Sequence, residues 1–143
     1  MSKGYPPVTF QGRYLGLVAL VVVQVLVGFI HVVFGLWMLS ASSLEVFGIV
    51  SSGHLAAYIY SMYTIVFGFL SLVFSAGLWL ERRWGWVGTV ALLAFVVIAD
   101  SLMLLDLPSV PGIPKFAGYG EITYSIIVLI YLWQNHIRVK YRI

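Results

Sequence analysis

Four long apolar runs that contain no proline constrain this chain more than any other feature of its sequence. They cover roughly residues 14–39, 56–80, 84–105 and 119–133. About 20 apolar residues in a helix cross a hydrocarbon core of about 30 Å, and a proline inside a helix costs ~3 kcal/mol. All five prolines lie outside the runs. The pattern therefore predicts four transmembrane helices, because a transmembrane β-barrel needs alternating segments of about 10 residues.

The composition agrees with lipid as the solvent. The chain is 62% hydrophobic and 9% charged, whereas a soluble domain carries roughly 25% charged residues. A soluble enzyme, a nucleic-acid-binding protein and a disordered chain are therefore excluded. The absence of cysteine removes disulfides, thiolate metal ligands and a cysteine nucleophile. We expect one transmembrane domain over residues 1–143, in the cell membrane, with the bilayer as its first partner.

The first apolar run could instead be a cleavable signal peptide. Lys3 and Arg13 precede it, and Ser40, Ala41 and Ser42 are small enough to form a cleavage site. Its length of about 25 residues exceeds the ~7–15 residues of a signal-peptide core. We therefore expect the run to be retained as a helix.

The basic residues predict the orientation in the membrane. Seven of the eight lie before the first run, between the second and third, or after the fourth: Lys3, Arg13, Arg82, Arg83, Arg138, Lys140 and Arg142. The other two connections carry only Lys115. Lys and Arg are enriched in cytoplasmic loops, so both termini should be cytoplasmic.

Short connections and small residues predict the packing. Only about three residues join the second and third runs, which requires an antiparallel hairpin. The simplest arrangement is an up-down-up-down four-transmembrane-helix bundle. Small residues mark close helix contacts in lipid, and the strongest candidates are Gly28, Gly35, Gly68 and Ser71. One such face could also mediate homo-oligomerisation.

Ionisable residues in the outer half of the apolar runs are the candidate functional residues. A charge at the bilayer centre costs at least ~2.5–3.5 kcal/mol, which makes each one a functional hypothesis. Asp100 and His31 lie within the third and first runs, roughly 8–12 Å below their outer ends. His54 precedes the second run, and Glu121 is expected in the first turn of the fourth helix, where it could simply complement the helix dipole.

Several chemistries fit such a cluster. A histidine beside a carboxyl group can relay a proton. Two histidines and two carboxylates could instead hold zinc, iron or manganese, although no metal-ligand spacing occurs on one helix. Haem ligation by His31 and His54 is a third option, made awkward by their different depths. No catalytic motif is present, so no catalytic residue is assigned, and metal and cofactor stay open.

One segment resembles a recurring pattern. A helix end at Gly77–Trp79, a basic turn at Glu81–Arg83 and a helix start at Trp84–Trp86 follow one another. These ten residues resemble the hairpin turn of small uncharacterised four-helix integral membrane proteins. The resemblance implies the hairpin and carries no activity. The chain lacks the glycine and arginine motifs of fluoride channels, and it has no acid near the middle of its first helix, unlike the small multidrug transporters.

Two functional hypotheses follow from these patterns. In the first, the chain is an oligomeric ion- or proton-binding or permeation unit, with Asp100 and His31 handling the charge. In the second, it is a non-catalytic accessory or assembly subunit of a larger membrane complex, and the polar cluster only holds helices together. A metal-dependent membrane enzyme has the least support, because no nucleophile or motif indicates one.

Overall fold

The protein is built from helices. The computed structural model describes residues 9–10, 13–46, 54–105 and 115–143, with the side chains of 14–40, 58–105 and 118–143. The helices are α1 (Leu15–Val46), α2 (His54–Trp79), α3 (Arg83–Leu104), α4 (Lys115–Leu132) and α5 (Asn135–Lys140). A two-residue strand, β1 (Thr9–Phe10), pairs antiparallel with β2 (Arg13–Tyr14) just before α1.

Three helices are long and apolar enough to cross a membrane. Their spanning segments are Leu15–Ser40, Tyr58–Trp79 and Arg83–Leu104. The apolar part of α4, Gly118–Leu132, is shorter. The predictions of an all-α fold class and of helices long and apolar enough to cross a membrane are confirmed, apart from the short β1–β2 pair before α1.

The helix ends differ from the predicted ones, most of all in α1. This helix continues to Val46, seven residues beyond the predicted end at 39. The Ser40 hydroxyl donates to the carbonyl oxygen of Trp37 at 2.7 Å, a local bond that lets a serine remain in a helix. Helix α4 begins at Lys115 rather than at 119. The prolines and Asp106 of the preceding connection lie outside the described residues.

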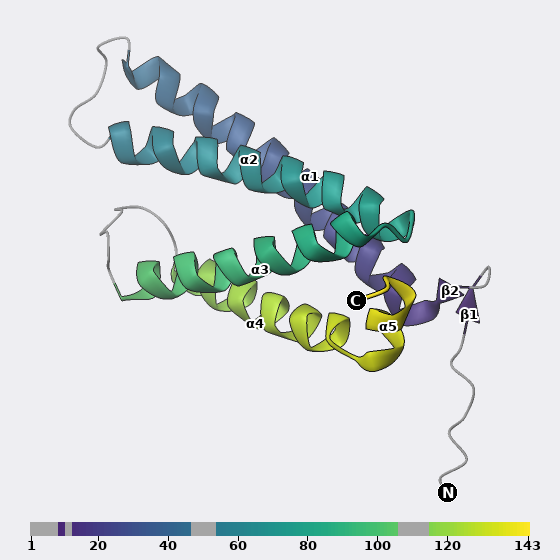
Figure 1. Cartoon of the computed structure of the whole chain (residues 1–143). Coiled ribbons are helices and arrows are strands. Elements are labelled where there is room, and N and C mark those ends of the chain that lie inside the picture. The colour runs from purple at the N-terminus through teal and green to yellow at the C-terminus, as the bar shows by residue number, and fades with distance from the viewer. Residues whose placement is uncertain (1–8, 11–12, 47–53, 106–114) are drawn as a thin grey trace, which may run out of the picture.

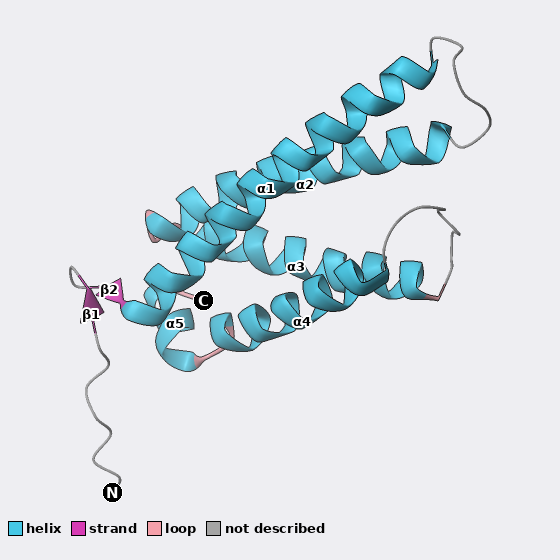
Figure 2. Cartoon of the chain, turned by 180° about the vertical axis from the view of Figure 1, so that it is seen from behind, coloured by secondary structure: helices cyan, strands magenta, loops and turns pink. Residues whose placement is uncertain are grey.

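The four long helices form two antiparallel pairs, α1 with α2 and α3 with α4 (Figure 1). The pairs lie close together where α2 turns into α3 and spread apart toward their other ends, as both views show (Figure 2). The turn is tight because Glu81 adopts a positive φ of 55°. Two backbone bonds, from Glu81 N–H to Leu78 O and from Arg82 N–H to Gly77 O, close the end of α2.

Glycines allow close contact in two places. A Cβ atom at Gly68 would lie 2.6 Å from the carbonyl oxygen of Gly28, and one at Gly85 would clash with the backbone of Gly77. The first contact joins α1 to α2 and the second joins α2 to α3. Gly35 likewise lies against α2, next to Ile65. Small residues therefore set the helix distances, as expected for packing in lipid.

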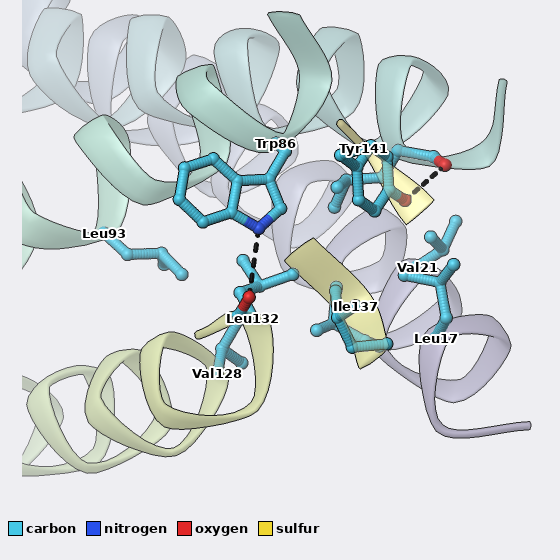
Figure 3. Packing of buried hydrophobic residues seen from close by; sticks show 10 residues of the cluster. Leu17, Val21, Trp86, Leu93, Val128, Leu132, Ile137 and Tyr141 are labelled. Carbon is cyan, nitrogen blue, oxygen red and sulfur yellow. Dashed lines mark hydrogen bonds between the residues drawn. The ribbon is translucent and has the colours of Figure 1, made fainter. Parts of the chain in front are cut away.

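Helix α5 packs against the ends of the long helices and completes the larger of the two apolar cores among the described residues. Ile137 and Tyr141 are almost fully buried there, beside Leu17 and Leu132 (Figure 3). The Tyr141 hydroxyl donates to the carbonyl oxygen of Leu78 at 2.8 Å, and the indole N–H of Trp86 donates to that of Leu132 at 3.0 Å. These bonds join the C-terminal segment and α4 to the α2–α3 turn.

Candidate functional site

His31 is on α1, and its side chain contacts residues of α2 and α4. Its Nδ1 atom is 2.8 Å from the carbonyl oxygen of Val27 and must donate, because a carbonyl only accepts. Its Nε2 atom is 3.4 Å from Oε1 of Glu121 on α4. The ring also packs edge-on against Phe67, with centroids 4.8 Å apart. Both ring nitrogens thus have a partner, and the contact with Glu121 joins one helix pair to the other.

Asp100 on α3 is the buried acid of the site, with only 4% of its surface exposed. Its carboxyl group lies close enough to the Glu121 carboxyl group for the two to interact electrostatically. Two carboxylates cannot bond each other without a proton between them. The second oxygen of Asp100, Oδ2, is buried and has no hydrogen-bond partner in the described part of the chain.

Two tyrosines of α2 complete the surroundings. Tyr60 and Tyr63 both lie close enough to Asp100 and Glu121 to interact electrostatically. The hydroxyl group of Tyr63 is buried and, among the described residues, also lacks a partner. We call His31, Tyr63, Asp100 and Glu121 the outer cluster. It contains one member from each of the four long helices.

The predicted site residues are not all found here. His31, Asp100 and Glu121 come together, but the side chain of His54 lies outside the described residues. The prediction that Glu121 lies in the first turn of α4 is wrong, because the helix begins six residues earlier, at Lys115. The helix dipole acts mainly within the first turn, so it does not explain an acid at this position.

The two other chemistries considered for the cluster find no support. Helix α2 begins at His54, about 20 Å along its axis from Phe67, the residue that touches His31. The two histidines are therefore too far apart to bind one haem iron. Within the described residues, no group of three His, Asp or Glu side chains could hold a metal ion.

A second polar cluster lies deeper in the bundle. The side-chain amide of Gln24 donates to the carbonyl oxygen of Ser71 and to the hydroxyl of Thr89, both at 3.4 Å. The Ser71 hydroxyl donates back to the main-chain carbonyl oxygen of Gln24 at 3.3 Å. We call Gln24, Ser71 and Thr89 the inner cluster, and all three are at least 98% buried.

An apolar layer separates the two clusters. Phe67, Leu92 and Val96 pack together there, and all are buried. On α2, Phe67 falls between Tyr63 and Ser71. On α3, Leu92 and Val96 fall between Thr89 and Asp100. These three apolar side chains therefore lie between the outer and inner clusters on α2 and α3.

Sequence reasoning missed two parts of this arrangement. It did not single out Tyr63, because a tyrosine in a membrane helix is common and only its unpartnered, buried hydroxyl distinguishes it. It also missed the bond from Gln24 to Thr89, although Gln24 shares a helix face with Gly28 and His31. A buried amide needs hydrogen-bond partners, so the sequence could have been searched for polar residues on the neighbouring helices within reach of Gln24.

Comparison with known proteins adds no assignment. No family model, no curated protein sequence and no solved structure matches this chain. Its function therefore has to be inferred from the outer cluster and from the placement of charge around the helices.

Proposed function

We propose that the chain spans the cell membrane four times, as an up-down-up-down bundle with both termini in the cytoplasm. Helix α4 has 18 residues and a length of about 27 Å, close to the thickness of the hydrocarbon core. The α2–α3 turn and the C-terminal segment lie at the same end of the molecule (Figure 1). They carry five of the basic residues, which supports a cytoplasmic location for that end.

We propose further that the outer cluster is a proton-binding site. The observation that carries this proposal is the placement of three titratable groups within apolar helices: Nε2 of His31 lies 3.4 Å from Oε1 of Glu121, and the buried carboxyl group of Asp100 interacts electrostatically with both residues. Since Nδ1 of His31 carries a hydrogen, its contact with Glu121 needs a proton on one of the two partners. A second proton would remove the electrostatic repulsion between the two carboxyl groups. The free Oδ2 atom of Asp100 and the Tyr63 hydroxyl offer the next acceptor and donor.

The apolar layer limits what a single copy can do. Phe67, Leu92 and Val96 place apolar side chains between the outer and inner clusters, and we propose that protons reach the outer cluster from the outer side. Transport across the membrane then requires a second conformation, or a second copy that supplies the missing path. We therefore propose that a single copy binds protons at the outer cluster. We propose that an oligomer of the chain uses this site for proton or cation permeation.

Substitution of Asp100 tests this proposal. Asp100→Asn can still donate a hydrogen bond to Glu121, so the purified protein should fold and melt as the unmodified chain does. It should nevertheless take up fewer protons between pH 5 and 8, measured with a soluble pH indicator. The infrared band of a protonated carboxyl group should weaken as well. In vesicles under a potassium diffusion potential, proton flux should fall in the same variant.

Two further variants make the result decisive. Glu81→Gln removes an acid at the opposite end of the molecule and should leave the infrared band and the flux unchanged. Asp100→Leu cannot bond Glu121 and should lower the melting temperature. If Asp100→Asn keeps normal proton uptake while Asp100→Leu is destabilised, the cluster only holds helices together. The accessory-subunit hypothesis would then replace ours.

A further inference from the structure

A basic hollow lies at the proposed cytoplasmic end of the bundle. It measures about 500 Å³ and is lined by the α2–α3 turn and the C-terminal segment. Its lining residues are Leu80, Glu81, Arg82, Arg83, Lys140, Tyr141 and Arg142. Four of these side chains are basic and one is acidic, which leaves the hollow with an excess of positive charge.

Most of that positive charge has no ion-pair partner in the part of the chain that the structure describes. Lys140 is paired with Glu81 at 2.9 Å, and its ammonium group also lies over the ring of Tyr14. Arg82, Arg83 and Arg142 are exposed, and the described part of the chain offers them no ion pair. Three arginines therefore line one hollow, and the described residues provide none of them with an ion-pair partner. A guanidinium group can donate two parallel hydrogen bonds to two oxygen atoms of one phosphate group.

The backbone around the hollow is held in an unusual conformation. Glu81 and Arg142 have φ values of 55° and 57°, and they are the only non-glycine residues with positive φ in the described residues. Each occupies the left-handed position that follows a helix, where glycine is preferred. In each case the next residue donates its N–H back to a carbonyl five positions earlier. Two helix ends thus turn the chain so that Glu81 and Arg142 border the same hollow.

We propose that this hollow binds the phosphate group of an anionic phospholipid. The hollow lies at the end of α2 and the start of α3, beside exposed Leu80 and two partly exposed tryptophans, Trp79 and Trp84. Tryptophan side chains of this kind sit at the level of lipid headgroups. Basic pockets between membrane helices on the cytoplasmic side bind anionic headgroups. The exposed apolar side chains favour a lipid over a soluble phosphate, because they offer a surface for acyl chains.

Lipid binding to the purified full-length chain in a neutral detergent tests the proposal. Native mass spectrometry is used to titrate dioleoylphosphatidylglycerol, dioleoylphosphatidylcholine and inorganic phosphate separately. The anionic lipid should bind at least tenfold more tightly than the zwitterionic one. Equal affinity for the two lipids would overturn the proposal. Inorganic phosphate that binds as tightly as the anionic lipid would show that the ligand is a soluble phosphate and not a lipid.

Charge variants locate the site. The triple variant R82Q/R83Q/R142Q should lose anionic-lipid affinity on the order of 100-fold, since each basic residue contributes roughly fivefold. Arg138→Gln is the matched control, because Arg138 lies at the same end but packs over Trp133 and is not among the lining residues. Equal losses in the triple variant and in this control would refute the assignment of the site.

A variant with increased affinity guards against a folding artefact. Glu81→Gln removes the acid of the hollow and releases Lys140 from its pair, so anionic-lipid affinity should rise several-fold. A misfolded protein cannot produce such a gain, and a loss of affinity in this variant would contradict the proposal. The site depends only on the membrane location of the chain. It can therefore stand or fall independently of proton binding at the outer cluster.

Discussion

Adding one methyl group at Gly68 should force α1 and α2 apart. In Gly68→Ala the new Cβ atom would lie 2.6 Å from the Gly28 carbonyl oxygen and 2.8 Å from the backbone nitrogen of Val32. Ordinary contact begins at 3.4 Å, so the two helices must separate by about 0.8 Å. Both obstacles are backbone atoms, and no rotamer change can relieve the clash.

The separation should break the hydrogen bonds between Gln24 and Ser71. These bonds are 3.3 and 3.4 Å long, so an added 0.8 Å takes them beyond bonding distance. Each bond between membrane helices contributes about 0.6 kcal/mol, and overpacking costs about 1–3 kcal/mol. We expect Gly68→Ala to lose about 2–4 kcal/mol in the free energy of unfolding, before the gain in helix propensity.

Gly120→Ala on α4 is the matched control for that gain. A Cβ atom at Gly120 meets nothing within 4 Å, so this variant receives only the helix propensity of alanine, up to about 1 kcal/mol. Both variants gain that contribution, and their difference isolates the clash. Unfolding free energies measured by steric trapping in detergent should therefore differ by about 2–4 kcal/mol. A difference below about 1 kcal/mol would refute the close contact between Gly28 and Gly68.

Three further predictions follow from the apolar layer, the C-terminal segment and the proposed orientation. Val96→Thr places a hydroxyl group in the apolar layer and should raise potential-driven proton flux several-fold in vesicles. Val87→Thr, at an exposed position of α3, should leave the flux unchanged, and equal fluxes in the two variants would argue against the layer as a barrier. Tyr141→Phe removes a buried hydrogen bond to the end of α2 and should cost about 1 kcal/mol in chemical unfolding, and an unchanged stability would show that this bond does not hold the C-terminal segment. A cysteine at Ser43 should react with an impermeant reagent in intact cells and one at Ser2 should not, and the reverse pattern would invert the proposed orientation.

The helices were predictable because a proline-free apolar run has few alternatives, but their ends were not. Residues 40–46 contain serines and an acid, a composition typical of a loop, yet α1 continues through them. Helix α5 has only six residues and carries two basic side chains in its last turn. A segment this short shows no periodicity, and its burial depends on Ile137 meeting a core built by distant residues.

Only those members of the candidate site whose burial in lipid costs the most free energy were predictable from the sequence. Asp100 and His31 were identified because a titratable group in lipid is expensive wherever it lies. Their partners were harder to find, because partners depend on helix rotation and register. Glu121 was attributed to the helix dipole from a start at 119, and four extra residues at the beginning of α4 removed that explanation. Tyr63 gave no signal, because its residue type is ordinary in a membrane helix.

The two helix pairs also suggest how proton binding could be coupled to movement. Glycine contacts hold α1 against α2 at Gly28, Gly35 and Gly68. The contact between His31 and Glu121 joins α1 of one pair to α4 of the other. If the outer cluster binds protons as proposed, a change in its protonation alters the strength of this contact. A ligand shifts an equilibrium only through its different affinity for the two states, and here the proton would act on a contact that joins the two pairs. Protonation would then control how far the pairs separate and, through that, whether the apolar layer of Phe67, Leu92 and Val96 stays closed.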